Sequence, residues 1–188
     1  MKHAIYSFTL VTMLLFLGSC RGEEQISREY LCRFSFDAVL HSTSKIVTAV
    51  NAQGYFVWIE MSKQDGVMHV KVHPADNSGD EDIALTTAAE NYISYELGAY
   101  NGIFLGRTNF SGLAAYDRQC PNCLHEYNTF TFPLTWTSKP MEVKCAKCNR
   151  TYSLETGASP QGGRRLMQYG VRETRNEFNI LQQVTVMN

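Results

Sequence analysis

Apolar residues recur with a period of two along most of the chain after residue 27, and Gly, Asn and Asp interrupt them at short intervals. Cys32, Phe34 and Phe36, for example, share one face of a predicted first strand. This alternation is typical of an antiparallel sheet with one buried face. The stretch 55–61 is almost wholly apolar and therefore predicts a central strand.

A hairpin is predicted next, because Asp65-Gly66 is a favourable two-residue turn before the alternating stretch 67–73. The second strand directs His69 and His73 outward. At about 3.3 Å per residue, histidines four apart on a strand lie roughly 13 Å apart and cannot share an ion. We therefore interpret both as surface residues.

The rest of the chain continues the same pattern. Residues 76–82 predict a loop and 87–91 a short helix, and no long amphipathic helix or internal repeat is evident. Pro133 restricts 130–136 to an edge or irregular strand. Further strands are predicted at 102–107, 113–117, 141–144, 151–154, 166–171 and 178–184. The sequence thus predicts one all-β domain over 28–188, built from antiparallel strands.

The first residues have the plan of a secretory signal. Lys2 precedes an apolar run over 4–16 that is too short to span a bilayer comfortably. Leu17-Gly18-Ser19-Cys20 resembles a bacterial lipobox, in which the thiol of the Cys is lipidated and the Cys becomes the new N-terminus. The predicted organisation is a signal peptide over 1–19 and lipidation at Cys20.

A polar, aperiodic stretch over 20–27 predicts a lipidated tether between membrane and domain. Two or more acyl chains give stable anchoring, so the membrane is an expected partner. Glu23 and Glu24 resemble the acidic export signals of surface lipoproteins. We expect an outer-membrane lipoprotein of the cell envelope, facing the periplasm or the surface, with an envelope protein as its partner.

Charge argues against nucleic acid as a partner. The chain has 17 Lys and Arg against 18 Asp and Glu, and Arg164-Arg165 is its most conspicuous basic pair. We interpret this pair as a solvated strand edge.

Two Cys-x-x-Cys pairs give the strongest chemical signal. Cys120 and Cys123 form the first pair and Cys145 and Cys148 the second, separated by residues 124–144. Two residues between thiols allow a tight turn to aim both sulfurs at one point, and this spacing is close to that of zinc ribbons. Asn149 follows the second pair, where a left-handed residue is commonly needed and Asn tolerates it. The pattern predicts a four-thiolate metal subdomain over about 117–157.

Other interpretations of the thiols remain open. In an oxidising envelope the four cysteines would form two disulfides, although a disulfide within Cys-x-x-Cys is strained. A thioredoxin-like redox site is disfavoured because the surrounding βαβ pattern is absent. Cys32 lies on an apolar strand face and is interpreted as a buried, inert thiol.

From about Gly102 onward the chain resembles the Rieske domain, a β-sandwich whose two loops hold a [2Fe-2S] cluster. The second Cys pair is followed by an aromatic residue at Tyr152, by Thr156-Gly157, and by a Gly/Pro-rich loop over 158–163, as in that family. The resemblance implies a Rieske-like sandwich carrying an inserted, rubredoxin-like four-cysteine subdomain.

The ligands depart from the Rieske pattern. Cys148 stands where the second loop of the family has a His, and Asn149 replaces a Gly. In the first loop Cys123-Leu124-His125 matches the Cys-x-His pattern, yet Cys120 completes a second Cys pair. A Rieske centre divides its ligands between two irons, whereas two Cys pairs favour a single ion. His125 is accordingly an alternative ligand or an exposed loop residue.

Two functions follow. The first is a non-catalytic protein whose ion, zinc, stabilises the fold and shapes a binding surface, since a closed four-thiolate site leaves no position for substrate. The second is an electron carrier holding rubredoxin-like iron or a [2Fe-2S] cluster. No nucleophile and base are recognisable elsewhere, so we do not expect the chain to be an enzyme by itself.

Overall fold

The computed structural model describes residues 26–100 and 102–188. The predicted signal peptide over 1–19, the lipidation site Cys20 and most of the tether therefore lie outside the described residues. In the part of the chain that is described, no helix combines the length and the hydrophobicity needed to cross a membrane.

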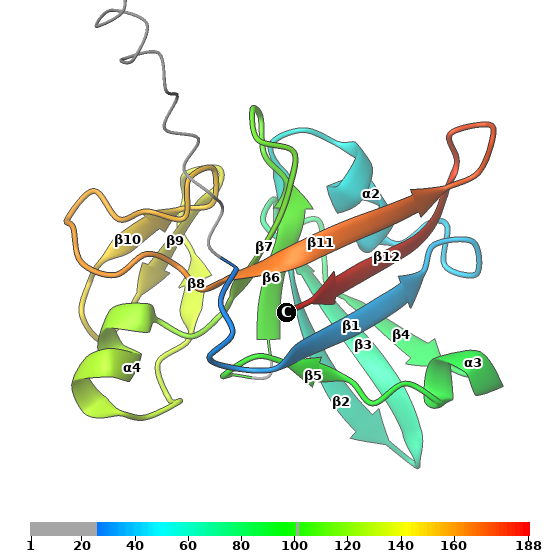
Figure 1. The fold of residues 1–188 in the computed structure, drawn as a ribbon, viewed down its shortest axis with the longest axis horizontal. Helices are drawn as coiled ribbons and strands as arrows, with labels where there is room; N and C mark the ends of the chain where they lie inside the picture. Colours follow the sequence, from blue (N-terminus) through cyan, green and yellow to red (C-terminus); the bar gives the residue numbers. More distant parts are fainter. Residues whose placement is uncertain (1–25, 101) are drawn as a thin grey trace, which may run out of the picture.

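Nine strands form one antiparallel sheet in the order β4-β3-β2-β6-β7-β11-β12-β1-β5 (Figure 1). The prediction of an antiparallel β protein is confirmed. The strands are β1 (Cys32–Asp37), β2 (Tyr55–Gln64), β3 (Val67–Pro74), β4 (Glu81–Leu85), β5 (Glu96–Leu97), β6 (Gly102–Arg107), β7 (Leu113–Asp117), β11 (Gln168–Arg175) and β12 (Leu181–Met187).

A second, three-stranded sheet lies between β7 and β11 in the chain, with the order β10-β9-β8. Its strands are β8 (Leu134–Trp136), β9 (Glu142–Cys145) and β10 (Thr151–Ser153). Helix α4 (Pro121–Tyr127) precedes this sheet, and Figure 1 shows the four elements together at one end of the molecule. The other helices are α2 (Lys45–Asn51) and α3 (Ala88–Asn91).

The predicted hairpin joins β2 and β3. Asp65 (φ 48°) and Gly66 (φ 87°) both adopt left-handed conformations, as a two-residue hairpin turn requires. The pairing runs from Gln64 opposite Val67 along both strands. Because β6 pairs with the other edge of β2, the stretch at 55–61 is a central strand, as predicted.

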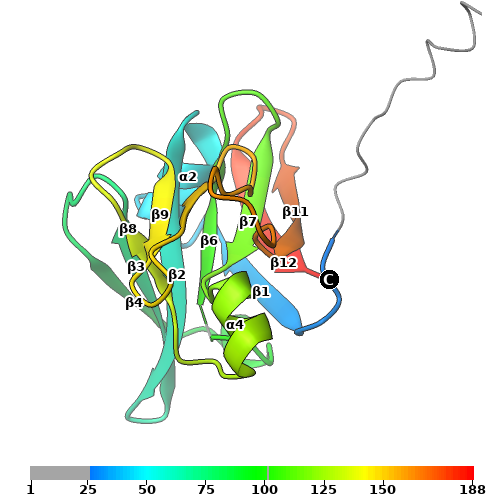
Figure 2. The same ribbon diagram turned by 90° about the vertical axis from the view of Figure 1, so that its left-hand side faces the viewer.

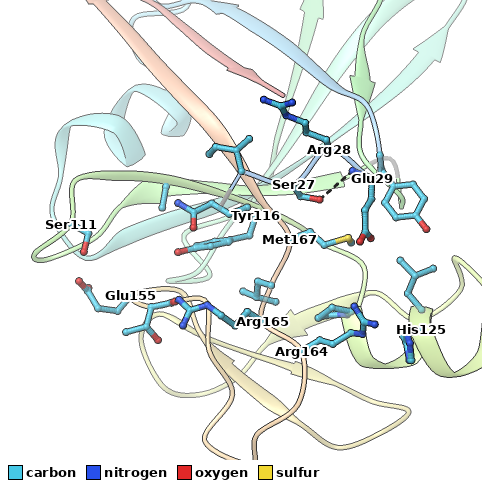
Figure 3. Close-up of a pocket in the computed structure, with 18 of the residues that line it drawn as sticks. Ser27, Arg28, Glu29, Ser111, Tyr116, His125, Glu155, Arg164, Arg165 and Met167 are labelled. Atoms are coloured by element: carbon cyan, nitrogen blue, oxygen red, sulfur yellow. Dashed lines mark hydrogen bonds between the residues drawn. The ribbon is translucent and has the colours of Figure 1, made fainter. Parts of the chain in front are cut away.

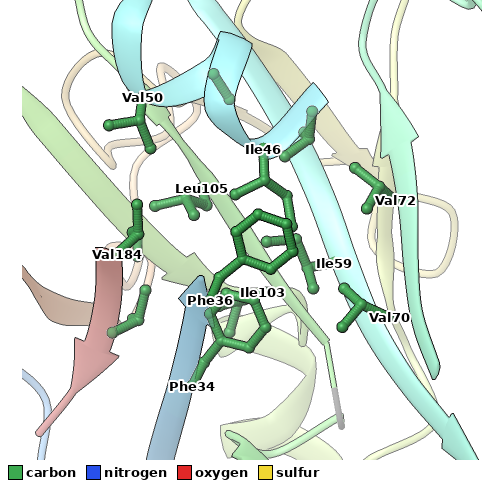
Figure 4. Packing of buried hydrophobic residues seen from close by; sticks show 14 of the residues in the cluster. Phe34, Phe36, Ile46, Val50, Ile59, Val70, Val72, Ile103, Leu105 and Val184 are labelled. Atoms are coloured by element: carbon green, nitrogen blue, oxygen red, sulfur yellow. The ribbon is translucent and has the colours of Figure 1, made fainter. Parts of the chain in front are cut away.

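The large sheet bends so that β1, β11 and β12 cross in front of β2, β3 and β4 (Figure 1). The two halves enclose the main core. Phe34 and Phe36 of β1 pack there with Ile59 of β2, Val184 of β12 and Ile46 of α2 (Figure 4). These side chains are at most 1% exposed, so their burial supplies the dominant stabilisation of this half of the molecule.

A second core lies on the other face of β2 and β6, toward the small sheet (Figure 2). Phe104 of β6 belongs to it, whereas its neighbours Ile103 and Leu105 belong to the main core. Alternate residues of one strand thus serve opposite cores. Burial on both faces explains why these strands are almost continuously apolar.

The structure differs from the predicted elements at its short helices, at β4 and β5, and at the ends of β11 and β12. The predicted helix is α3, whose N-cap Thr87 forms a capping box with Glu90. Helix α2 was not predicted; the hydroxyl of Ser44 caps it by accepting from the backbone N–H of Ile46 at 3.1 Å. Strand β4 begins at Glu81, inside the predicted loop, and the Glu81 carboxylate accepts from the Ser44 hydroxyl and the Lys45 N–H, both at 3.0 Å.

Candidate metal centre

Four cysteine sulfurs gather where helix α4 meets the small sheet. The Sγ atoms of Cys120, Cys123, Cys145 and Cys148 lie within 4.8 Å of one another. The Cys120 and Cys148 sulfurs are 3.7 Å apart, and those of Cys123 and Cys145 are 3.6 Å apart. Around a tetrahedral ion with metal–sulfur bonds of about 2.3 Å, sulfurs lie roughly 3.8 Å apart. The spacing therefore fits four ligands on one ion.

The first Cys pair lies on the first turn of helix α4. Cys120 is the N-cap, Pro121 follows at the first helical position, and Cys123 lies within the first turn. Pro is favoured there because its fixed φ suits the helix and its missing N–H is not needed. The Leu124 N–H donates to the Cys120 carbonyl at 3.0 Å and closes the turn. A helical turn, rather than an isolated loop, thus directs these two thiols together.

The second Cys pair begins at the last residue of β9. Asn149 has φ 59°, so the predicted left-handed conformation is confirmed. Its N–H donates to the Cys145 carbonyl at 3.0 Å, and the Cys145 N–H donates to the Arg150 carbonyl at 2.9 Å. The chain therefore turns back tightly into β10 and brings Cys148 beside Cys145.

Burial shapes the acid–base properties of the thiols. Cys120, Cys123 and Cys145 are 0% exposed, whereas Cys148 is half-buried. Burial raises the pKa of the Cys120 thiol to about 11 and raises the pKa of Cys123 further. Burial also opposes ionisation of Cys148, but the backbone N–H and guanidinium of Arg150 outweigh it and lower that pKa to about 7. Four thiolates in this setting need a cation among them.

A hydrogen-bond chain supports the first pair. The Tyr152 hydroxyl lies 3.5 Å from the Cys120 sulfur and accepts from the Asn122 amide at 2.6 Å, so its own proton is free to point at the sulfur. The Asn122 carbonyl oxygen accepts from the Arg164 N–H at 3.1 Å. A Cβ at Gly163 would lie 2.5 Å from that oxygen, so this close approach requires glycine. Asn122 was not among the residues predicted from the sequence.

The other sequence candidates lie elsewhere. His125 is exposed on α4 and is absent from the group of four sulfur ligands, which includes Cys120 instead. Cys32 is 1% exposed in the main core, as predicted, and burial raises its pKa strongly. Of the two ligand sets considered, the structure brings together the one with four cysteines.

The strand histidines have acidic partners. His69 lies 2.6 Å from an Asp82 carboxylate oxygen, and His73 lies 2.8 Å from Asp80. Both histidines are part-exposed on β3, and neither belongs to a group of metal-ligand side chains among the described residues. Their interpretation as surface residues is consistent with these contacts.

A buried carboxylate marks the point where the chain leaves the large sheet for the metal centre. Asp117, the last residue of β7, is 0% exposed and accepts from the N–H groups of Ala99 and Gln119, both at 2.6 Å, and from the Tyr169 hydroxyl at 2.7 Å. Burial raises its pKa to about 6, although the three hydrogen bonds act in the opposite direction.

The arrangement can hold a metal ion but offers little for catalysis. The described cysteines are free thiols, and the sulfur separations of 3.6–3.7 Å far exceed the roughly 2.05 Å of a disulfide. Four protein ligands complete a tetrahedral ion and leave no position for substrate. Searches against protein-family models, curated proteins and solved structures returned no match to this chain. The geometry of the site therefore carries the functional argument.

Proposed function

We propose that the chain binds one zinc ion on Cys120, Cys123, Cys145 and Cys148, and that the ion has a structural role and shapes a binding surface. The observation that carries this proposal is the mutual approach of the four sulfurs to within 4.8 Å. Zinc accepts four thiolates in a tetrahedral site and has no redox chemistry of its own. The chain then acts through binding and not as an enzyme.

A mononuclear iron is the second candidate. Iron takes the same four thiolates, and the half-buried Cys148 brings one edge of the site to the surface, where electrons could pass to a partner. A [2Fe-2S] cluster fits less well, because two irons would hold the thiolate pairs further apart than these sulfurs lie.

The position of the site supports a relation to the Rieske domain. In this chain a small ligand-bearing sheet is inserted between β7 and β11, and two segments supply the ligands, as two loops do in the Rieske domain. We propose that this chain is a Rieske-like protein in which a single ion replaces the cluster. The lipobox sequence supports a further proposal, anchoring through Cys20 to the outer membrane, where an envelope protein is the partner.

Metal analysis of the protein from its own compartment tests the site. We expect one zinc ion per chain and no visible absorption, because zinc thiolates are colourless. Cys120→Ala should lose the ion or bind it far more weakly, whereas His125→Ala should keep it. Retention in Cys120→Ala with loss in His125→Ala would overturn the four-cysteine site. A coloured protein containing iron would favour the second candidate.

Labelling with a palmitate analogue tests the anchor separately. We expect the wild-type chain to take up label and the Cys20→Ala chain to remain unlabelled. Label on Cys20→Ala would disprove this anchor without affecting the metal proposal.

A further inference from the structure

A cleft of about 1700 Å³ brings together two sequence features that the metal centre leaves unexplained, His125 and the pair Arg164-Arg165. Its walls come from α4, the chain between β10 and β11, the β6–β7 loop and the segment 26–30 (Figure 3). It therefore lies between the large sheet and the metal-bearing end, outside the four-sulfur group.

The floor of the cleft is apolar. Tyr116 of β7, Leu124 of α4 and Leu166 are 3–6% exposed and line it. Leu124 follows Cys123 on the helix, so the fold that gathers the thiols also fixes one wall of the cleft. Apolar floors with a few polar groups at one end are the usual form of small-molecule sites.

One end of the rim carries exposed cationic side chains. Figure 3 shows His125 and Arg164 side by side at one end, whereas the side chain of Arg28, on the facing segment, points away from them. Among the described residues, the guanidinium groups of Arg28 and Arg164 form no ion pair or hydrogen bond. Arg165 differs, because it donates to the Thr156 carbonyl. The Arg164 guanidinium beside His125 is thus available to a ligand.

Two acidic groups also line the cleft, and they differ in availability. The Glu155 carboxylate accepts from the N–H groups of Asn109 and Phe110 at 2.8 and 3.1 Å, so it is occupied at the far end. Glu29 lies near the cationic end (Figure 3), and its carboxylate makes no hydrogen bond or ion pair to a described residue. Glu29 therefore repels an incoming anion. Removing its charge should strengthen anion binding.

We propose that this cleft binds an amphipathic anion, a phosphate or carboxylate group attached to an alkyl chain. Arg164 and His125 receive the anionic group, since a guanidinium group binds such oxygens with paired hydrogen bonds. The alkyl chain lies on the floor of Tyr116, Leu124 and Leu166. The same chemistry is offered by a lipid head group and by a free alkyl phosphate or fatty acid. This inference does not depend on the identity of the metal.

Calorimetric titration of the full chain, held in nanodiscs of zwitterionic phosphatidylcholine, tests the proposal with three probes. We expect hexyl phosphate to bind at least tenfold more tightly than inorganic phosphate, and hexanol to show no saturable binding. Equal affinity for inorganic and hexyl phosphate would overturn the apolar part of the site. Saturable hexanol binding of equal strength would overturn the anionic part.

Charge variants locate the binding. We expect Arg164→Gln to weaken hexyl phosphate binding about tenfold, the effect of about 1.4 kcal/mol, and Glu29→Gln to strengthen it. Arg33→Gln and Arg172→Gln remove exposed arginines that lie outside the cleft and should leave binding unchanged. Equal losses in the cleft and control variants would overturn the assignment. Metal content should stay at one ion per chain in every variant. Failure of the cleft proposal can therefore be told apart from failure of the metal proposal.

Nanodiscs that contain phosphatidylglycerol distinguish the source of the ligand. If the head group of a membrane lipid occupies the cleft, these discs should compete with hexyl phosphate, and Arg164→Gln should abolish the competition. Unchanged hexyl phosphate affinity in these discs would assign the site to a free amphiphile.

Discussion

The two cores of this molecule are stabilised in different ways. The main core draws on both halves of a nine-stranded sheet and on α2, and its buried members are almost entirely aliphatic and aromatic side chains. The second core includes three of the four cysteine ligands, Cys120, Cys123 and Cys145, beside aromatic residues such as Tyr152 and Phe104. Hydrophobic burial can sustain the first core, whereas the second places groups that become charged on metal binding inside an apolar shell.

The small sheet, whose three strands are very short, depends on its surroundings for stability. Strands β8 and β10 have three residues each, below the size at which an isolated sheet is stable in water. The small sheet packs on β2 and β6, and an ion held by the four sulfurs would link α4 to β9 within the same core. The large sheet should therefore survive without metal, and the small sheet should not.

Metal removal should give the largest effect. Structural zinc sites contribute on the order of 10 kcal/mol, because the ligands meet only in the folded chain. With chelator and reductant present, we expect amide protection to fall by about a hundredfold or more in β8, β9 and β10 and to change little in β2 and β3.

Hydrogen exchange measures this difference directly, and re-addition of zinc is its control. A uniform loss of protection over both sheets would show that the two cores unfold as one cooperative unit.

Removal of a ring from the main core should give the next largest effect. Phe36→Ala deletes a side chain that is 1% exposed, and we expect a loss of about 3–5 kcal/mol in the free energy of unfolding. The matched control is Leu40→Ala, at a side chain 54% exposed, with a change within about 0.5 kcal/mol. Urea unfolding measures both. Loss of the metal from folded Phe36→Ala would contradict the independence of the two cores.

The stability contributed by Asp117, which lies at the junction between the cores, should depend on pH. Burial raises the pKa of Asp117 from 3.8 to about 6, so between these values the folded chain keeps a proton that the unfolded chain has lost. Stability from this group is therefore present at low pH and lost as pH rises toward 6, by up to about 3 kcal/mol.

Urea unfolding of wild type and Asp117→Asn at matched metal saturation, from pH 5 to pH 7, isolates this contribution. The wild type should lose more stability than the variant as pH rises. Parallel pH profiles would exclude a raised pKa at this position.

The smallest effect should come from the turn after the second Cys pair. Ala tolerates the left-handed φ of 59° less well than Asn does. Asn149→Ala should therefore weaken the free energy of metal binding by about 1 kcal/mol. Asn149→Gly should bind the metal as well as wild type or slightly better. Competition with a chelator measures the ratio of metal affinities between each variant and the wild type. Weakening by Gly equal to that by Ala would assign the role of Asn149 to its side chain.

Much of the strand pattern could be predicted from the sequence, because period-two alternation is local. Strands β6 and β7 were predicted with the bounds that the structure gives. Helices α2 and α4 were missed because seven residues hold too few turns for a helical period to appear. Their signals were single residues, Ser44 as an N-cap and Pro121 at a first helical position.

The candidate site was predicted in part. Spacing alone indicated the two Cys pairs, but the choice between Cys120 and His125 depended on which direction each side chain takes from α4. The contact of Asn122 with Tyr152 joins residues 30 positions apart, and no local pattern encodes such a contact. The cleft likewise joins α4, the β6–β7 loop and the segment 26–30, so composition alone pointed only to a solvated Arg pair.

The pairing of β1 with β12 has a consequence for the order of folding. Arg33 lies opposite Met187, so this part of the ladder joins distant segments, whereas the sulfur contacts of the metal centre span 22 and 28 positions. Contacts that are close in sequence form faster because less loop entropy is lost. During synthesis the metal-bearing insert can assemble before residues 181–187 emerge, while β1 is paired only with the two residues of β5 and still lacks β12. The nascent chain is then most prone to aggregation just before its last strand arrives.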